Sequence, residues 1–275
     1  MHTPVLLKEV IENLDIKAKG TYIDATFGEG GYSKAIIEER GRVLAIDLDE
    51  KQLSGSKIGK IENLKMVQGN FSNIEKIAKE NDYFPVDGIV FDLGLSMGQL
   101  DNSGRGFSYK KLMEPLDMRI DPNSKLTAFD LIRNATEDEL YEIIARNSEE
   151  LAAREIARTI KYGNHLKRIN TVGNLIYAID KAIGEKSNRV YRKIFQALRI
   201  EVNHEFENLK KGLEGAVSIL KKDGKIVIVT FHSLEDRIVK NFVRSRGLKF
   251  ANKKPVISFS GRSFEKSAKL RVITL

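Results

Sequence analysis

Apolar residues in the first third of the chain alternate between short continuous runs and stretches with helical spacing. The continuous runs lie at residues 22–25, 43–46, 64–67 and 86–92. Helical spacing follows the first two of these runs, at residues 33–40 and 50–58. Short apolar runs that alternate with helices are typical of strands pairing in parallel, so the pattern predicts an α/β protein built on a parallel sheet.

This alternation stops after residue 103. Residues 104–121 follow neither period, and helices are then expected at 136–146, 148–161 and 171–183, the first opened by the capping box of Thr136 and Glu139. Residues 191–220 are mostly helical, and strands resume at 225–231 and 270–275. We therefore predict a discontinuous sheet domain, 1–103 with 191–275, interrupted by a helical insertion at 104–190.

A glycine-rich turn, D-A-T-F-G-E-G-G from Asp24, follows the first predicted strand, and Asp47 ends the second. Glycines at 28, 30 and 31 let a backbone bend tightly and a ligand approach closely. A carboxylate at the second strand tip accepts the hydroxyl protons of a ribose. The unit therefore predicts a site for an adenosine-containing cofactor.

Two cofactors fit this unit. A dinucleotide site has G-x-G-x-x-G, but Ser33 occupies the third glycine position here. Asp24 would repel a pyrophosphate, whereas S-adenosylmethionine carries positive charge that a carboxylate favours. These residues favour S-adenosylmethionine, with a glycine turn of some other α/β protein as the alternative.

Other predicted strand ends also carry candidate residues. The third strand leads to Phe71, which is placed to contact an adenine or to pack on the following helix. The fourth ends at Asp92, where parallel sheets of this kind face the reacting end of a cofactor. Near the end of the chain we expect Ser233 to cap a helix and His232 to be exposed at a strand tip.

Composition excludes several classes of protein. The 275 residues are 41% hydrophobic and 31% charged, which is typical of a soluble globular protein. There is no cysteine and the four histidines are scattered, so neither disulfides nor a metal site is expected. No apolar run reaches membrane length and no signal peptide is apparent, so we expect a cytoplasmic protein without membrane contact.

The net charge of +8 is unevenly distributed. Residues 154–193 hold ten basic residues against three acidic ones, and residues 244–271 hold nine against one. Such clusters are typical of a surface that binds a polyanion, although a charge run is often only a solvated face. Nucleic acid is the partner that this distribution favours.

Motifs along the whole chain resemble one family. They are H-T-P-V-L-L from His2, T-F-G-E-G-G-Y-S from Thr26, D-L-G-L-S-M-G-Q-L-D from Asp92, F-Q-A-L-R-I-E-V-N from Phe195 and F-H-S-L-E-D-R-I-V-K from Phe231. R-G-F-S-Y and P-L-D-M-R-I-D follow the third of them. In this order they resemble the ribosomal RNA small subunit methyltransferase H family, also called MraW.

The resemblance implies a Rossmann-like class I methyltransferase with an inserted helical subdomain. It implies methyl transfer from S-adenosylmethionine to the N4 amine of a cytidine in the decoding region of 16S rRNA. Together, the resemblance and the glycine turn give these cofactor-binding residues: Asp24, Gly28, Gly30, Gly31, Tyr32, Asp47, Phe71, Asp92 and Gln99. The chain departs from the family at Tyr32, where histidine is usual, at Met97-Gly98, where Ser-Pro is usual, and before S-A-K-L-R, where Asn-Pro-Arg is missing.

Methylating an exocyclic amine requires an acceptor for one of its protons. We expect Asp92, or a carbonyl of the loop to Ser96, to act here, with His232 as a second candidate. Phe107 and Tyr109 are expected to stack on an extruded base.

The residues predicted to contact RNA are Arg105, Phe107, Tyr109, Arg189, Arg192 and Arg199. The expected partner is small-subunit rRNA within the 30S subunit or a late precursor, and a homodimer is considered. The rival interpretations are an NAD-dependent oxidoreductase and a noncatalytic RNA-binding assembly protein.

Overall fold

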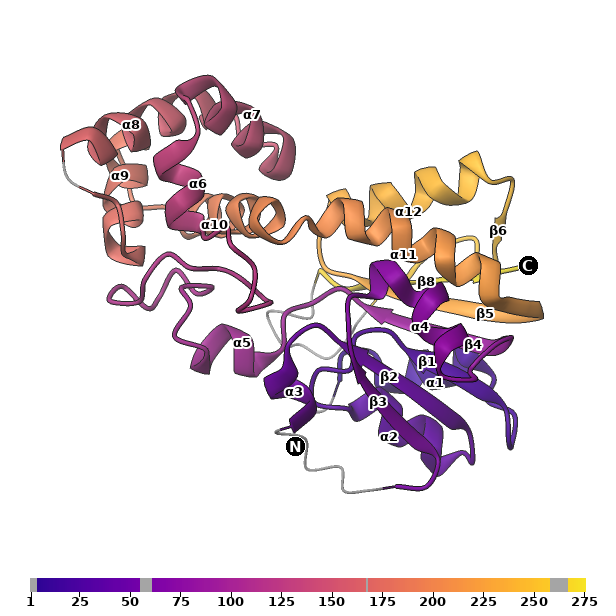
Figure 1. The fold of residues 1–275 in the computed structure, drawn as a ribbon. Coiled ribbons are helices and arrows are strands. Elements are labelled where there is room, and N and C mark those ends of the chain that lie inside the picture. The colour runs from indigo at the N-terminus through magenta and orange to yellow at the C-terminus, as the bar shows by residue number, and fades with distance from the viewer. Residues whose placement is uncertain (1–3, 55–60, 167, 258–266) are drawn as a thin grey trace. The chain divides into compact units, whose positions relative to one another are not determined.

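The computed structural model describes residues 4–54, 61–166, 168–257 and 267–275. Two compact units form the chain: residues 1–94 with 206–275, called the sheet unit, and residues 95–205, called the helical unit (Figure 1). The sheet unit is discontinuous. It ends after residue 94 and resumes at residue 206, whereas the sequence predicted that it ends after residue 103 and resumes at residue 191. Helix α10 (Asn188–Asn203) explains the second difference because its apolar face belongs to the core of the helical unit.

The sheet unit contains an eight-stranded sheet among its described residues. Its strands are β1 (Thr21–Asp24), β2 (Arg42–Asp47), β3 (Leu64–Gln68), β4 (Val86–Asp92), β5 (Leu220–Thr230), β6 (Lys249–Phe250), β7 (Val256–Ile257) and β8 (Lys269–Thr274). They run in the order β3-β2-β1-β4-β5-β8-β6, with β7 also paired to β8. Strands β1 to β5 are parallel and β8 is antiparallel to β5, so the predicted parallel α/β sheet is confirmed. The strand order changes direction between β1 and β4, which is where open α/β sheets bind ligands.

Helices cover both faces of this sheet. They are α1 (Leu7–Leu14), α2 (Gly31–Glu38), α3 (Glu50–Ser54), the short η1 (Phe71–Asn73), α4 (Ile74–Glu80), α11 (Glu205–Ile219) and α12 (Ser233–Ser245). Tyr22 of β1 lies in a core with α1 and α2, whereas its neighbour Ile23 lies in a core with α4, α11 and α12. Successive side chains of a strand point to opposite faces, so β1 is buried on both.

A buried ion pair joins the last strand to the last helix. Arg271 of β8 donates to both carboxylate oxygens of Asp236 in α12, with Nη2 3.3 Å from Oδ2. The guanidinium also lies 4.9 Å from the ring centroid of Phe250. Since both partners are buried, the arginine holds the pKa of Asp236 below its usual range despite the burial.

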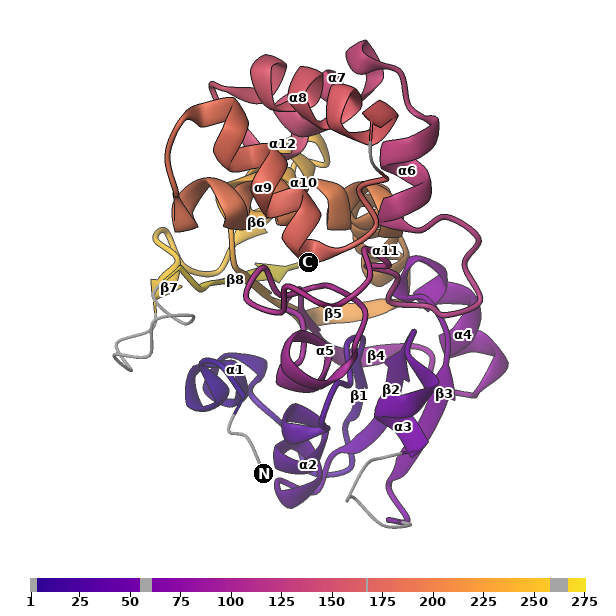
Figure 2. The same cartoon turned by 90° about the vertical axis from the view of Figure 1, so that its left-hand side faces the viewer.

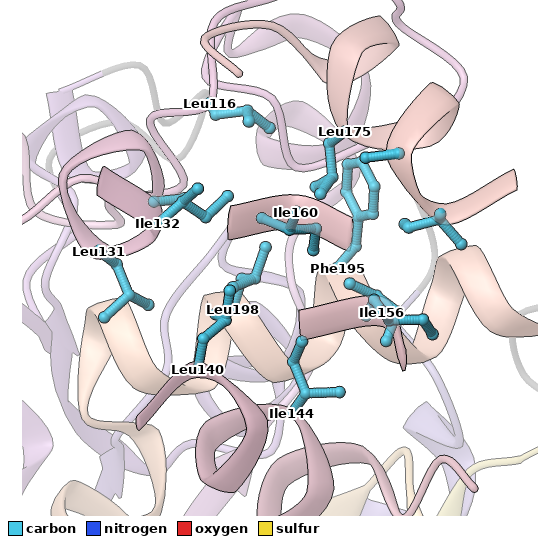
Figure 3. Packing of buried hydrophobic residues seen from close by; sticks show 14 of the residues in the cluster. Leu116, Leu131, Ile132, Leu140, Ile144, Ile156, Ile160, Leu175, Phe195 and Leu198 are labelled. Atoms are coloured by element: carbon cyan, nitrogen blue, oxygen red, sulfur yellow. The ribbon is translucent and has the colours of Figure 1, made fainter. Parts of the chain in front are cut away.

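The helical unit contains α5 (Met97–Asn102), α6 (Ala128–Asn134), α7 (Glu137–Ser148), α8 (Ala153–Leu166), α9 (Val172–Ile183) and α10 (Asn188–Asn203). The capping box of Thr136 and Glu139 is confirmed, whereas the next helix begins at Ala153 rather than at the predicted residue 148. Ile144, Ile156 and Phe195 are among the residues that fill its core (Figure 3).

The loop between α5 and α6 is held against α10 within the helical unit. Asn203 donates from Nδ2 to the Met118 carbonyl at 2.7 Å and accepts from the Ile120 amide at 2.7 Å. Gly106 adopts φ +73°, and a Cβ there would lie 2.2 Å from the Pro115 carbonyl oxygen. The Asn203 bonds tie the loop to the last helix of the unit at Met118 and Ile120, and the close approach at Gly106 holds the loop to itself.

In the described part of the chain, no helix combines the length and apolar character that crossing a membrane requires.

Candidate active site

Three aspartates end neighbouring parallel strands. Asp24 ends β1, Asp47 ends β2 and Asp92 ends β4. Asp24 pairs in register with Ala45 on one side and with Val90 on the other. Asp47 and Asp92 stand two residues beyond these partners on the two flanking strands, so the sequence prediction that the three carboxylates lie at one sheet edge is confirmed.

Asp24 is completely buried and accepts hydrogen bonds from residues on both sides of the glycine turn. Its Oδ2 accepts from the Ser33 amide at 3.1 Å and from the Ser33 hydroxyl at 2.7 Å, and its Oδ1 lies 3.4 Å from the Thr26 amide. Burial raises its pKa to about 6, while the Ser33 hydrogen bond acts in the opposite direction. Asp24 thus shapes the turn and the start of α2; direct contact with a cofactor stays a prediction.

Asp47 connects the second strand to the same turn. Its Oδ2 accepts from the Gly28 amide at 2.7 Å and its Oδ1 from the Asp49 amide at 2.9 Å. Burial raises the pKa of Asp47, and these backbone hydrogen bonds oppose the shift. Each carboxylate oxygen has a second acceptor direction, so the group retains capacity for ribose hydroxyls.

The glycines of the turn have different surroundings. Gly28 adopts φ +53°, and the nearest atom to a Cβ there lies 4.0 Å away, so its surface is open. At Gly31 a Cβ would lie 2.1 Å from Cγ of Pro4. Gly31 therefore leaves room for Pro4 where a side chain would stand, and Gly28 has open space there; contact of either glycine with a cofactor stays a prediction.

Tyr32 and Asp92 form the second half of the site. The Tyr32 hydroxyl is 2.5 Å from the Val5 carbonyl oxygen and 3.1 Å from Asp92 Oδ2. Asp92 Oδ1 accepts from the Gly94 amide at 3.1 Å, and the Thr26 hydroxyl accepts from the Asp92 amide at 2.7 Å. The single hydroxyl proton of Tyr32 is thus shared between the Val5 carbonyl and the Asp92 carboxylate.

Burial raises the pKa of Asp92 to about 6. Hydrogen bonds from Gly94 and Tyr32 counteract the shift, and the negative charge of Glu235 adds to it. Asp92 therefore changes protonation close to neutral pH, which is the range that suits a group handling protons.

Phe71 follows β3 and packs inside the sheet unit. Its ring meets Phe91 edge to face with centroids 5.6 Å apart, and a Cβ on Gly212 of α11 would lie 2.7 Å from its Cδ2. The packing role is observed, while contact with an adenine stays a prediction.

The start of α12 differs from the sequence prediction at His232 and Ser233. His232, not Ser233, is the N-cap of α12, in a capping box with Glu235. Glu235 Oε2 accepts from the Phe231 amide at 2.8 Å, and His232 Nε2 lies 3.0 Å from Glu235 Oε1. The prediction of an exposed His232 was wrong, since its side chain is 14% exposed. Its catalytic role stays a prediction, and the structure gives the imidazole a capping role.

Ser96 and Gln99 belong to the helical unit. Ser96 is the N-cap of α5: its hydroxyl accepts from the Gln99 amide at 3.1 Å, and its own amide donates to Gln99 Oε1 at 3.0 Å. The S-x-x-Q pattern could have predicted this box. Gln99 is buried and its side-chain oxygen makes this bond, while its contact with a cofactor stays a prediction.

Two predicted RNA contacts have their guanidinium groups bonded within the helical unit. Arg105 donates from Nη1 to the carbonyls of Arg119 at 2.9 Å and Ile120 at 2.8 Å. Arg199 pairs with both carboxylate oxygens of Glu205, at 2.7 and 2.9 Å. Both arginines therefore stabilise the unit itself.

Phe107 is 6% exposed and belongs to the hydrophobic core of the helical unit. A ring buried in this way cannot stack on a base, so that expectation does not fit the structure. Tyr109 is partly buried, with its ring centroid 5.8 Å from that of Tyr191 and 6.3 Å from that of Phe195.

The remaining two candidates, Arg189 and Arg192, lie on α10 and are exposed. Arg189 Nη1 is 3.5 Å from Glu150 Oε2, and its side chain is 65% exposed. Of the six residues predicted to contact RNA, these two present the most accessible cations.

Two residues that the sequence analysis did not single out, Thr26 and Glu235, hold the backbone at the strand ends of the site by hydrogen bonds. Thr26 holds the Asp92 backbone, and Glu235 fixes the end of β5. A threonine two residues after the first strand and an acid three residues after the N-cap histidine were the available signals.

A parallel sheet with a glycine turn after β1 and carboxylates ending β1, β2 and β4 defines a Rossmann-like enzyme of the methyltransferase class. The chain belongs to the MraW methylase family, whose model matches residues 1–274. Membership of a methylase family supports S-adenosylmethionine, the cofactor that the sequence predicted.

Relatives of known name are similar over most of the chain. Ribosomal RNA small subunit methyltransferase H of Clostridium botulinum strain 657 is 44% identical over 247 residues, covering 87% of this chain and 80% of the relative. The protein of that name from Carboxydothermus hydrogenoformans is 43% identical over 250 residues, covering 88% and 80%. Among solved structures, an rRNA methylase from Streptococcus thermophilus aligns with a TM-score of 0.45 and 10% identity, covering 100% of this chain and 98% of that one.

Proposed function

We propose that this protein methylates small-subunit ribosomal RNA, at the N4 amine of a cytidine in the decoding region, with S-adenosylmethionine as methyl donor. The observation that carries the proposal is that Asp24, Asp47 and Asp92 end neighbouring strands at one sheet edge, where Asp47 holds an open Gly28, in a chain of the MraW methylase family. The relatives' shared name supports the substrate class.

The residues at this edge fit S-adenosylmethionine. Asp47 accepts from the ribose hydroxyls while the Gly28 amide keeps its carboxylate in place. Acidic groups at three strand ends favour a ligand with positive charge and disfavour the pyrophosphate of a dinucleotide. When bound, the cofactor supplies an electrophilic methyl group on a sulfonium.

Asp92 acts on the substrate amine. The lone pair of a cytosine N4 amine is delocalised into the ring, so an acceptor that bonds an amine proton makes the nitrogen more nucleophilic. In the balanced reaction nitrogen gains the methyl group as the methyl–sulfur bond of the donor breaks and the electron pair stays on the sulfur of a neutral thioether. Nitrogen also loses one proton, which Asp92 receives and passes to solvent. With a pKa of about 6, the carboxylate is mostly ionised at neutral pH and can accept it. A carbonyl of the loop to Ser96 and His232 are the other acceptors that the sequence offers.

The helical unit binds the RNA in this proposal. Exposed cations such as Arg189 and Arg192 contact phosphates, which fixes the position of the strand without reading its sequence. The substrate is the 30S subunit or a late precursor, the protein acts in the cytoplasm, and its oligomeric state is open to a homodimer.

The decisive experiment uses small subunits from cells lacking this modification. We expect incubation with methyl-labelled S-adenosylmethionine to yield labelled N4-methylcytidine by nucleoside mass spectrometry. Asp92→Ala should abolish transfer, while Asp82→Ala, at an exposed aspartate of the same unit, should not change it. Label in another nucleoside would overturn the N4 assignment, and no label at all would overturn the enzymatic function.

A separate test concerns the division of labour between the units. Arg192→Ala should weaken RNA binding and leave the affinity for S-adenosylmethionine unchanged. Equal losses in both affinities would contradict an RNA-binding role confined to the helical unit.

A further inference from the structure

Two neighbouring helices of the helical unit expose aromatic rings beside basic side chains. On α8 the exposed positions 154, 158 and 162 recur every four residues and carry Arg154, Arg158 and Tyr162. On α9 the exposed positions include Tyr177 and Lys181, which are also four apart. Residues at this spacing share one helix face, so each helix presents a stripe in which an aromatic ring follows or precedes a cation.

Lys181 joins the two stripes. Its Nζ lies 5.7 Å from the ring centroid of Tyr162 on α8, while Tyr177 is one turn away on its own helix. Helices α8 and α9 pack against one another in the helical unit, as Figure 2 shows. Tyr162 is 58% exposed and Tyr177 70%, which are large fractions for rings that a folded unit normally covers.

The exposed basic residues continue from α9 onto the loop that precedes α6. The Gly173 amide donates to the Leu112 carbonyl at 2.9 Å, which places this loop beside the first turn of α9, one turn from Tyr177. Lys110 and Lys111 on the loop are exposed. The loop therefore extends the stripe of α9 with two more cations.

The cations of this surface are available to phosphates. Arg154 pairs with Asp138, and Arg158 pairs with Glu155 at 2.6 Å, but all four side chains are at least 44% exposed. Exposed pairs of this kind contribute little and exchange partners readily. Within the described residues, Lys181 makes no ion pair.

Exposed tyrosines interleaved with cations match the chemistry of unpaired RNA, whose bases stack on aromatic rings while its phosphates attract lysine and arginine. A protein partner would instead favour an apolar centre depleted of charge. We propose that the face formed by Tyr162, Tyr177 and Lys181, called here the tyrosine–lysine face, binds an unpaired strand of the substrate RNA. This inference rests on the proposed function and assigns part of its RNA recognition to α8 and α9, away from the arginines of α10.

Fluorescence anisotropy with a labelled, unstructured cytidine-rich RNA of about a dozen nucleotides tests the face directly. Tyr162→Ala and Tyr177→Ala should each weaken binding by about 5- to 100-fold, as lost base stacking predicts. Tyr177→Phe should bind like the unmodified protein because the ring remains. Lys181→Ala should reduce the slope of log K for RNA binding against log salt concentration by roughly one, because one phosphate contact is lost.

A matched control lies in the sheet unit. Phe84 is 50% exposed and has Lys79 Nζ 5.3 Å from its ring centroid, the same pairing of an exposed ring with a lysine. Phe84→Ala should leave RNA affinity unchanged. Circular dichroism of each variant verifies that the fold is retained, which is expected because every substituted side chain is exposed.

Each outcome decides between the two proposals. Unchanged RNA affinity in both tyrosine variants, or an equal loss in Phe84→Ala, would overturn the tyrosine–lysine face while methyl transfer by the unmodified protein upholds the proposed function. Normal binding of free RNA combined with loss of activity on assembled subunits would show a protein contact and would also overturn it. RNA binding that depends on the tyrosines without any methyl transfer would uphold the face and overturn the proposed function.

Discussion

Replacing Asp24 with asparagine should change the pH dependence of stability. Asp24 is completely buried, and burial raises its pKa from 3.8 to about 6. Because the folded pKa lies above the unfolded one, the folded state holds the proton more tightly than the unfolded state does. The cost of burying the carboxylate is therefore fully present above pH 6 and disappears as the pH falls toward 3.8.

The two pKa values set the size of the effect. At 1.36 kcal/mol per pKa unit, the buried carboxylate costs about 3 kcal/mol at pH 8 and roughly half as much at pH 5. Asparagine does not titrate, so the free energy of unfolding of Asp24→Asn minus that of the unmodified protein should fall by roughly 1 to 2 kcal/mol from pH 8 to pH 5. Lost hydrogen bonds to Ser33 subtract a constant of about 1 kcal/mol and leave this slope unchanged.

Urea unfolding at pH 5, 6, 7 and 8 measures the difference. The chain has no tryptophan, so far-UV circular dichroism is the suitable signal. Asp82→Asn, the same substitution at an exposed position of the same unit, serves as the control. A pH-independent difference for Asp24→Asn would refute the assignment of Asp24 as a buried carboxyl with a raised pKa.

Three further predictions address the site and its support. Tyr32→Phe removes a hydrogen bond that lowers the pKa of Asp92, so that pKa should rise further above about 6 and the acid limb of the kcat/KM profile should move to higher pH; an unmoved limb would separate Asp92 from the rate. Gly104 and Gly106 both have positive φ, but only a Cβ at Gly106 meets a carbonyl oxygen of its own loop, at 2.2 Å. Gly104→Ala should therefore cost about 1–2 kcal/mol and Gly106→Ala clearly more, and equal melting temperatures would contradict this. Arg271→Met leaves a buried carboxylate without its main partner and should cost about 3–5 kcal/mol in urea unfolding, whereas a loss below about 1 kcal/mol would show that the carboxylate finds another.

The sheet and its acidic edge could be predicted from local pattern because apolar runs and their terminal acids are neighbours in sequence. Asp24, Asp47 and Asp92 each end a run, and parallel pairing then brings them together. The surroundings of each carboxylate could not be predicted, since they depend on residues far away in sequence, such as Tyr32 beside Asp92.

Errors in the sequence analysis have the same origin. Phe107 lies in a stretch without periodicity, so its burial depends on packing with distant helices of its unit. His232 and Ser233 are both polar at a helix start, and only the position of the Glu235 carboxylate decides which of them is the cap. The boundary after residue 205 depends on which core takes the apolar face of α10, and an isolated amphipathic pattern does not specify its partner.

The discontinuous sheet has a consequence for synthesis on the ribosome. Strand β4 has its hydrogen-bonding partner β1 on one side, but its other partner, β5, is made only after the whole helical unit. At about 5–20 residues per second, that delay is on the order of ten seconds. During this interval the nascent chain carries a largely apolar strand with one unpaired edge, so a chaperone that shields it is expected to govern the yield of folded protein more than the stability of the finished molecule does.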